Sequence, residues 1–398
     1  MFDCGCKKAV FLGLLMTLPL KPATAGDWSG YVAAEGRVFP SAALQAGQED
    51  ADVSLAAQVS YRQAFGKQTS ITVTPFARWD VADDARSHAD MREMYVDWYN
   101  NEIELRAGIR KVFWGVTESV HLVDIINQTD LVESIDGEEK LGQLMLNLSV
   151  PRSWGTVDVF VLPTFRERTF PGDKGRFRPA LTIDTGQAQY ESSEKQRHVD
   201  YALRYFHTLG DWDIGLSYFQ GTSRDPVFEL STVSGAPELL PYYPQIRQTG
   251  LDAQWVNGAW LWKLEAIYRT STLEDYYANA LGFEYTLSGI LDSRTDLGVI
   301  SEWIYDDRGA DATTPFYNDV MLGLRFAFND AASSDALLSV IHNVDTDSQV
   351  VRLEANRRLG ENWKISLKGG LFTNIARRNV LYDWRNDDYV QLSLARYF

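Results

Sequence analysis

The sequence is poor in cysteine and has no long apolar run after its first 25 residues. Its two cysteines are Cys4 and Cys6, so the chain beyond them has no thiol. A chain without thiols suits export through an oxidising compartment, where stray thiols can be bridged by mistake. Because a helix needs about 18 or more apolar residues to cross a bilayer, we expect no membrane-spanning helix.

Positive charge is also scarce. The chain has 38 Lys and Arg against 54 Asp and Glu, a net charge of -16, and removal of residues 1–25 (Asp3, Lys7, Lys8 and Lys21, net +2) makes it -18. Nucleic acid is therefore not expected as a partner, because phosphate binding needs basic clusters. Aromatic side chains, in contrast, are plentiful, with 12 Trp, 19 Tyr and 19 Phe.

The N-terminus has the three parts of a secretory signal peptide. A lysine pair at residues 7–8 is followed by an apolar run over residues 9–20 and by a small-residue site that ends at Ala25. A cytosolic N-terminal helix is the alternative reading of the apolar run, which is too short to span a bilayer. We predict cleavage near Ala25. The mature chain, residues 26–398, would then be a single domain.

Segments of alternating apolar and polar residues recur throughout the mature chain. Outer-membrane barrel strands have this pattern, because one side faces lipid and the other faces the lumen. Short connections such as Gly66-Lys67 and Gly210 alternate with long ones such as 166–196 and 221–245, as expected for short periplasmic turns and long external loops. We count 18 segments, near residues 27–38, 52–65, 67–80, 90–99, 102–113, 141–150, 154–165, 197–208, 211–220, 246–257, 259–270, 278–288, 295–306, 316–329, 335–343, 349–358, 362–374 and 387–398.

The pattern predicts an all-β fold, a transmembrane antiparallel β-barrel of about 18 strands (about 16–18). A soluble sandwich is the alternative. It would explain neither Trp and Phe at strand ends nor an unbroken series of segments without a linker. The last segment ends at Phe398, and a terminal aromatic resembles the signal that outer-membrane barrels present to their assembly machinery. Arg396 departs from that signal, since an apolar residue is more usual there.

The alternation stops after Trp114, at a stretch rich in carboxylates. Residues 116–140 contain seven Asp and Glu and one Lys, yet residues such as Val123 and Ile126 make the stretch too apolar for a freely solvated loop. We predict that it folds into the lumen as a constriction loop. An external cap is the alternative. Carboxylates facing arginines across a passage would align polar solutes and select ions. The candidate pore-lining and constriction residues are Arg78, Arg106, Arg110, Trp114, Glu118, His121, Asp124, Asn127, Asp130 and Glu133.

Two short motifs in this region resemble a known family. Residues 108–115 read G-I-R-K-V-F-W-G, and residues 124–130 read D-I-I-N-Q-T-D. They resemble the G-R-x-x-x-x-W-G and D-x-x-N-P-x-D segments of a porin-like family of Gram-negative outer-membrane proteins catalogued as a domain of unknown function. Gln128 stands where that family commonly has Pro, and Lys111 where a polar neutral residue is common. The resemblance implies an outer-membrane channel and no particular substrate.

Motifs for catalysis or metal binding are scarce. The five histidines are scattered, and no H-E-x-x-H, G-x-S-x-G or calcium-loop spacing occurs. His121 beside Asp124 and Ser119 is the one local cluster, which we interpret as pore-lining rather than catalytic. We therefore expect no enzyme activity, no cofactor and no metal.

The sequence predicts a porin-like channel in the outer membrane of a Gram-negative bacterium, for passive diffusion of small hydrophilic solutes. Its expected partners are outer-membrane lipid and lipopolysaccharide, the barrel assembly machinery through Phe398, and further copies of itself if it forms a homo-trimer. The alternative is a barrel without an open pore, which acts as a surface enzyme or as a docking partner in an envelope complex.

Overall fold

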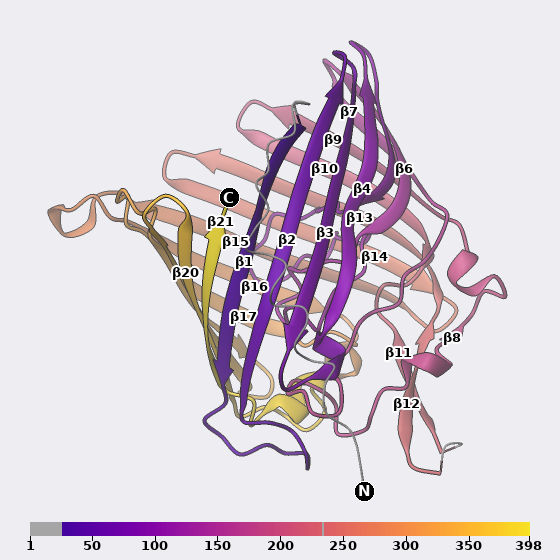
Figure 1. The fold of residues 1–398 in the computed structure, drawn as a ribbon, viewed down its shortest axis with the longest axis vertical. Helices are drawn as coiled ribbons and strands as arrows, with labels where there is room; N and C mark the ends of the chain where they lie inside the picture. Colours follow the sequence, from indigo (N-terminus) through magenta and orange to yellow (C-terminus); the bar gives the residue numbers. More distant parts are fainter. Residues whose placement is uncertain (1–25, 233–234) are drawn as a thin grey trace, which may run out of the picture.

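The computed structural model describes residues 26–232 and 235–398, which form a closed antiparallel β-barrel of 18 strands (Figure 1). Each of the 18 predicted segments overlaps one barrel strand, so the predicted fold is confirmed. The predicted signal peptide, residues 1–25, lies outside the described residues. The barrel strands are β1 (Gly26–Val38), β2 (Ala51–Phe65), β3 (Thr69–Asp80), β4 (His88–Tyr99), β5 (Glu104–Arg110), β6 (Gln143–Arg152), β7 (Gly155–Leu162), β9 (Asp200–Leu209), β10 (Trp212–Thr222), β13 (Gln245–Asn257), β14 (Trp260–Ser271), β15 (Asp275–Leu287), β16 (Asp296–Asp306), β17 (Asn318–Ala327), β18 (Asp335–Asn343), β19 (Gln349–Leu359), β20 (Trp363–Thr373) and β21 (Tyr389–Tyr397).

The barrel closes between its first and last strands. β1 pairs with β21 from Tyr31 opposite Tyr397 to Val38 opposite Val390, in addition to its pairing with β2. The backbone N–H and C=O groups of Phe398 continue this ladder, with two 3.1 Å hydrogen bonds to Gly30. Closure leaves no unpaired edge, which is the requirement for a sheet that stands alone in lipid.

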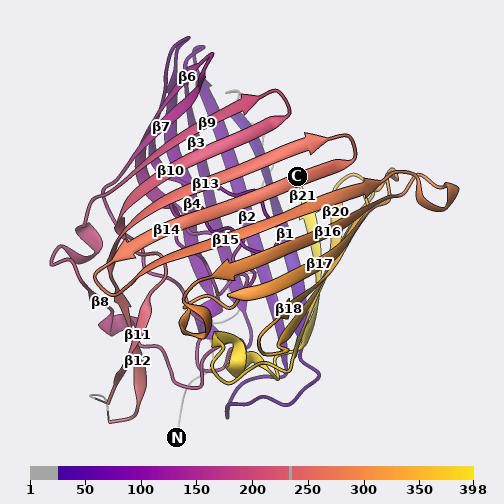
Figure 2. The same ribbon diagram turned by 180° about the vertical axis from the view of Figure 1, so that it is seen from behind.

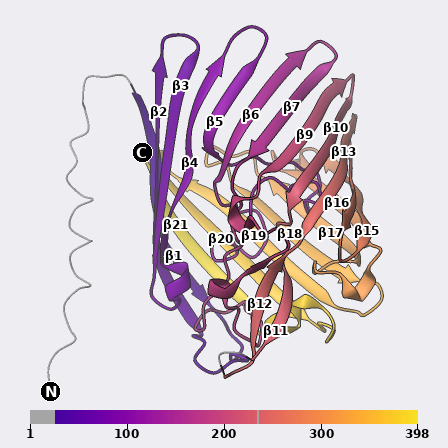
Figure 3. The ribbon, with the colours of Figure 1, turned by 90° about the vertical axis from the view of Figure 1, so that its right-hand side faces the viewer.

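Connection lengths differ between the two ends of the barrel. Figure 3 shows tight hairpins at one end, the short-turn end, and long connections at the other, the long-loop end. Gly210, between β9 and β10, has φ of +62°, a conformation that glycine adopts without strain. At the long-loop end, β8 (Gln189–Tyr190), β11 (Val227–Ser231) and β12 (Glu238–Tyr243) form a small second sheet that the sequence did not predict.

The helices are single turns in connections. They are η1 (Asp84–Arg86), η2 (Thr185–Gln187), η3 (Lys195–Arg197), η4 (Ile290–Asp292), η5 (Gly309–Asp311) and η6 (Val380–Trp384). Within residues 26–232 and 235–398, no helix has the length and hydropathy needed to cross a membrane.

The two faces of the barrel wall differ as the alternation predicts. On β17, Leu322 is 59% exposed on the outer face, while its neighbour Met321 is 2% exposed on the inner face. On β14, part of the near wall in Figure 2, Trp260 and Trp262 are exposed and stack with ring centroids 5.7 Å apart. The outer surface is therefore apolar and aromatic along strands from all around the barrel.

A pair of engineered cysteines tests the closing register. Ala33 and Ala395 lie opposite each other on β1 and β21, and both are buried. Because opposed residues bring their Cα atoms within disulfide range, we expect Ala33→Cys with Ala395→Cys to oxidise almost completely, giving a gel shift that reductant reverses. Ala33→Cys with Leu394→Cys is the control and stays reduced, since Leu394 faces outward. Oxidation of the control pair would mean a register shifted by one residue.

Candidate functional site

Residues 116–140, the predicted constriction segment, bind strands from separate parts of the wall. The carboxylate of Glu265 on β14 accepts hydrogen bonds from the backbone N–H groups of Val116 (2.7 Å) and Thr117 (3.0 Å) and from the Thr117 hydroxyl (2.8 Å). Glu265 is fully buried, where an unpaired N–H would cost about 1–3 kcal/mol. The carboxylate therefore supplies acceptors that a neighbouring strand would supply in the wall.

A second buried carboxylate binds the next two residues. Glu302 on β16 accepts hydrogen bonds from the N–H groups of Glu118 (2.7 Å) and Ser119 (2.8 Å) and from the Ser119 hydroxyl (2.6 Å). The side chain of Glu118 forms an ion pair with Arg325 on β17. Residues 116–119 are thus fixed to β14, β16 and β17.

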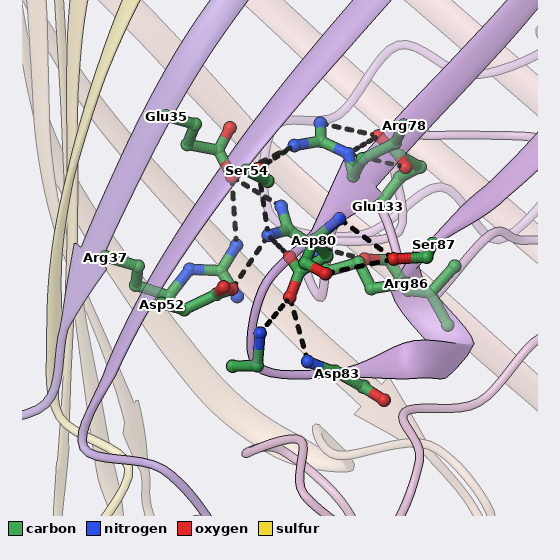
Figure 4. Close-up of polar contacts among 12 residues, drawn as sticks. Glu35, Arg37, Asp52, Ser54, Arg78, Asp80, Asp83, Arg86, Ser87 and Glu133 are labelled. Atoms are coloured by element: carbon green, nitrogen blue, oxygen red, sulfur yellow. Dashed lines mark hydrogen bonds and ion pairs between the residues drawn. The ribbon is translucent and has the colours of Figure 1, made fainter. Parts of the chain in front are cut away.

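Arginines on a distant part of the wall hold the middle of the segment. Arg78 on β3 donates two hydrogen bonds to Glu133 (2.9 and 2.8 Å), beside Arg86 in a network of wall carboxylates (Figure 4). Arg92 on β4 forms an ion pair with Asp130 (2.7 Å). Because β3 and β14 are third and eleventh of 18 strands in barrel order, the segment joins nearly opposite sides of the wall.

The apolar residues of the segment are buried against the inner face of the wall. Val123 and Ile126 have no exposed surface, and they pack in one cluster with Trp114 and with residues of β6 to β15 such as Met145. Arg224, also buried, donates to the carbonyl oxygen of Ile126 (3.0 Å). This packing fixes the segment to the inner face of β6 to β15.

The motif residues fold the segment itself. Asn127 accepts from the N–H of Val112 (2.8 Å) and donates to the carbonyls of Arg110 and Leu141 (both 2.8 Å), so it ties the two ends of the segment together. Gly115 has φ of +145°, and a Cβ there would lie 3.0 Å from an oxygen of Glu265. Glycine at position 115 therefore allows the backbone to approach the Glu265 carboxylate closely, and this carboxylate anchors the segment.

Only one of the three predicted wall arginines meets the segment's carboxylates. Arg78 binds Glu133, as described. Arg106 instead pairs with Asp97 of β4 (2.9 Å), and the Arg110 side chain donates to Asn147 of β6 (3.0 Å). Arg106 and Arg110 line a separate cavity of about 260 Å³ next to Trp114. The sequence predicted carboxylates and arginines that face each other across a passage and align polar solutes. Such an electric field needs charges that stay apart, whereas Arg78 and Glu133 are in direct contact.

Ser119, His121 and Asp124 are near in sequence but have different partners. Ser119 donates to Glu302, and Asp124 accepts from the Trp114 N–H (3.2 Å) while pairing with Lys140 (3.2 Å). His121 binds Glu138 (2.7 Å). No nucleophile and base are therefore paired among these three. In the described part of the chain, no three acidic or histidine side chains are grouped to hold a metal ion.

The charge of His121 is set by its surroundings. Burial lowers the pKa of His121, but the carboxylates of Glu138 and Glu265 outweigh it and raise that pKa to about 10. His121 is thus an imidazolium at neutral pH. Burial has the opposite effect on the neighbouring carboxyl, because it raises the pKa of Asp124 despite the ion pair with Lys140.

Three cavities lie between the segment and the wall from β14 to β20. The outer cavity, about 410 Å³, is lined by Phe228, Phe372 and Trp384 at the long-loop end. The inner cavity, about 360 Å³, is lined by residues such as Phe113 and Ser339. The central cavity, about 230 Å³, is lined by Arg269, Tyr276 and several residues of the segment. Asp136 and Arg352 line all three.

A four-residue charge cluster marks the junction of the cavities. Lys368 on β20 binds Asp136 of the segment (3.0 Å) and Glu354 of β19 (3.3 Å). Arg352, two residues before Glu354, completes the cluster. We call these four residues the junction cluster. None of the four is among the predicted site residues, although strand alternation places residues 352, 354 and 368 on the inner face.

The connection 163–199 extends across the long-loop end. Its Arg176 binds Asp387, before β21 (2.7 Å), and Asp50, before β2 (2.9 Å). Since the connection leaves β7, the seventh strand, and its partners flank the first and last strands, it crosses the mouth of the barrel. Phe177 of the same connection packs with Trp384 beside the outer cavity.

Comparisons with known proteins found only distant similarities. No family model matches the chain, and no curated protein matches its sequence. Among solved structures it is similar to OmpT, an outer membrane protein of Vibrio cholerae, in a trimer form (11% identity, TM-score 0.48, 94% of this chain and 99% of that one). It is also similar to a variant of the Rh. blastica porin (15% identity, TM-score 0.46, 94% and 100%). Such low similarity carries nothing about function, and the family resemblance stays a prediction.

Replacement of the main anchor should loosen the segment. In Glu265→Gln the hydrogen bonds to Val116 and Thr117 lose their charged acceptor, so amide exchange at residues 116–117 should speed up about tenfold or more, measured by hydrogen exchange in detergent micelles. Glu274→Gln, at a half-exposed carboxylate that binds Arg308, is the matched control. Unchanged exchange at 116–117 in the first variant would contradict the anchoring role.

The segment should also respond to pH through His121. Its folded pKa lies above the ordinary value of about 6.5, so its contribution to stability is complete below pH 6.5 and is lost as the pH rises toward 10. We expect the imidazole NMR signal of His121 to titrate near pH 10. Segment protection should fall between about pH 6.5 and 10, and His121→Gln should abolish that fall. A midpoint near 6.5 would refute the assignment.

Proposed function

We propose that the protein is an outer-membrane channel for passive diffusion of small solutes. The observation that carries the proposal is the series of three cavities that meet at Asp136 and Arg352. In this proposal solutes enter through the outer cavity, pass the junction cluster and leave through the inner cavity. Residues 116–140 act as the constriction, because they extend across the interior between β3 and β14.

Membrane insertion is supported by the outer surface. Exposed apolar side chains occur on strands around the barrel, among them Leu216, Leu281 and Leu322, and Trp260 and Trp363 lie near strand ends. All strands are paired, so no backbone edge would face lipid. The position in the outer membrane, the removal of residues 1–25, assembly through Phe398 and a homo-trimer remain parts of the proposal.

Charge at the junction cluster supports passage of polar solutes. Asp136 and Glu354 share Lys368, and Arg352 adds a second positive charge, so the junction cluster has no net charge. Mixed charges on facing walls favour polar solutes over apolar ones without strongly excluding either ion sign. The proposed activity needs no catalytic residue, which agrees with the separate partners of Ser119 and His121.

A thiol reagent can locate the path of ions. In a background without Cys4 and Cys6, Glu354→Cys places a thiol at the junction cluster. We expect stepwise conductance in planar bilayers, and a cationic methanethiosulfonate should lower the single-channel current to less than about half, because it adds bulk and charge where the cavities share lining residues.

Leu338→Cys is the matched control, on the outer face of the adjacent β18. Its current should not change with the reagent. If the reagent does not change the conductance of the Glu354→Cys variant, ions do not pass the junction cluster. Bilayers that stay silent for the unmodified protein would refute the channel and favour the barrel without an open pore.

A further inference from the structure

Arg352 is a cation without an anionic partner at the junction of the cavities. Its side chain is half-buried, and its guanidinium lies over the ring of Phe316, 5.7 Å from the centroid. Among residues 26–232 and 235–398, no ion pair or hydrogen bond involves the guanidinium of Arg352. A guanidinium has five N–H donors, so all of these are left for solvent or a ligand.

Other inner cations of this region are already paired. Arg325 binds Glu118, Lys368 binds Asp136 and Glu354, and Arg269 binds Asp225 (3.0 Å). Each of these pairs satisfies a charge and holds a loop or the constriction segment in place. Arg352 holds nothing in place, so its charge is available for recognition.

Of the three cavities beside Arg352, the outer cavity is mainly apolar. The outer cavity, about 410 Å³, is within the usual range of about 300–1,000 Å³ for small-molecule sites. Its lining is dominated by aromatic and aliphatic side chains, including Phe170, Phe228, Phe372, Trp384 and Leu381. A solute with only polar groups would lose hydrogen bonds to water there without replacement. An apolar body would instead lose contact with water, which is favourable.

We propose that the outer cavity and Arg352 form a binding site for amphipathic monocarboxylates. The carboxylate accepts hydrogen bonds from the guanidinium of Arg352, and the apolar body, aromatic or medium-chain aliphatic, lies in the outer cavity. The inference rests on the proposed channel and narrows its solutes from small hydrophilic compounds in general to this class.

The charges of the junction cluster select the number of carboxylates. Asp136 and Glu354 share the single charge of Lys368, so one negative charge remains close to the site. One guanidinium can pair with one carboxylate in a bidentate geometry. A second carboxylate on the solute would find no free cation and would be repelled by the nearby acids, so dianions bind more weakly.

Binding is measured by calorimetry on the full barrel in detergent micelles, which does not require conduction. The probes are 2-naphthoate and octanoate, with 2-naphthamide, which has the same rings without charge, and acetate, which has the charge without the apolar body. We expect both amphipathic probes to bind at least about tenfold more tightly than 2-naphthamide and acetate, because neither half of the site suffices alone.

Arg352→Gln should weaken 2-naphthoate binding about tenfold or more and leave 2-naphthamide unchanged. Arg352→Lys should recover part of the lost 2-naphthoate affinity, since a lysine keeps the positive charge but cannot bind a carboxylate in a bidentate geometry. Arg358→Gln, on the same face of β19 toward the short-turn end, is the matched control and should bind like the unmodified protein. Equal binding of 2-naphthoate and 2-naphthamide to the unmodified protein would overturn the inference even if Arg352→Gln did not fold.

Bilayer recordings separate this inference from the channel itself. If 2-naphthoate binding depends on Arg352 but the barrel never conducts, the proposed channel function is refuted and the binding site is supported. If the barrel conducts but does not bind the amphipathic carboxylates selectively, the channel function is supported and the proposed binding site is refuted.

Discussion

Two buried carboxylates determine how the interior of this barrel is organised. A strand in the wall finds its hydrogen-bond partners in its neighbours, but residues 116–119 have no neighbouring strand. Glu265 and Glu302 accept the N–H groups of these four residues instead. Without them, four donors would be left unpaired among buried side chains, at about 1–3 kcal/mol each. An irregular segment can therefore lie against the wall at these positions.

The position of that segment makes the two sides of the interior different. On the side of β6 to β15, Trp114, Val123 and Ile126 complete one apolar cluster. On the side of β16 to β20, Val120 and Ile135 pack against a second apolar cluster, and cavities remain beside Asp136 and Arg352. A barrel of this strand number is wide enough for an aqueous channel, so what fills it decides where a solute can pass.

The two family-like motifs have a structural role in this arrangement. Asn127 joins both ends of the segment, Asp130 pairs with Arg92, and Gly115 allows close approach to Glu265. These residues shape the segment, while the groups that face open space lie elsewhere, at Arg352 and its neighbours. Because the motif residues serve the fold, they say little about any ligand, which has to be inferred from the lining of the cavities.

The sequence by itself determined the barrel. Alternation with period two fixes which face of each strand is apolar, and the lengths of the connections fix the parity of the strands, so all 18 strands and their inner faces could be predicted. These signals are local. The charge pattern and apolar content of residues 116–140 likewise indicated a segment that needs a surface to pack on.

Only the tertiary structure decided which wall residues this segment meets. Arg78, Arg106 and Arg110 all lie on inner faces near it in the sequence, yet only Arg78 reaches its carboxylates, because Arg106 and Arg110 find partners on adjacent strands. The partners of the segment on β14, β16 and β20 lie more than 100 residues away in the chain. Barrel closure brings them together, and no local pattern encodes which charge remains unpaired at residue 352.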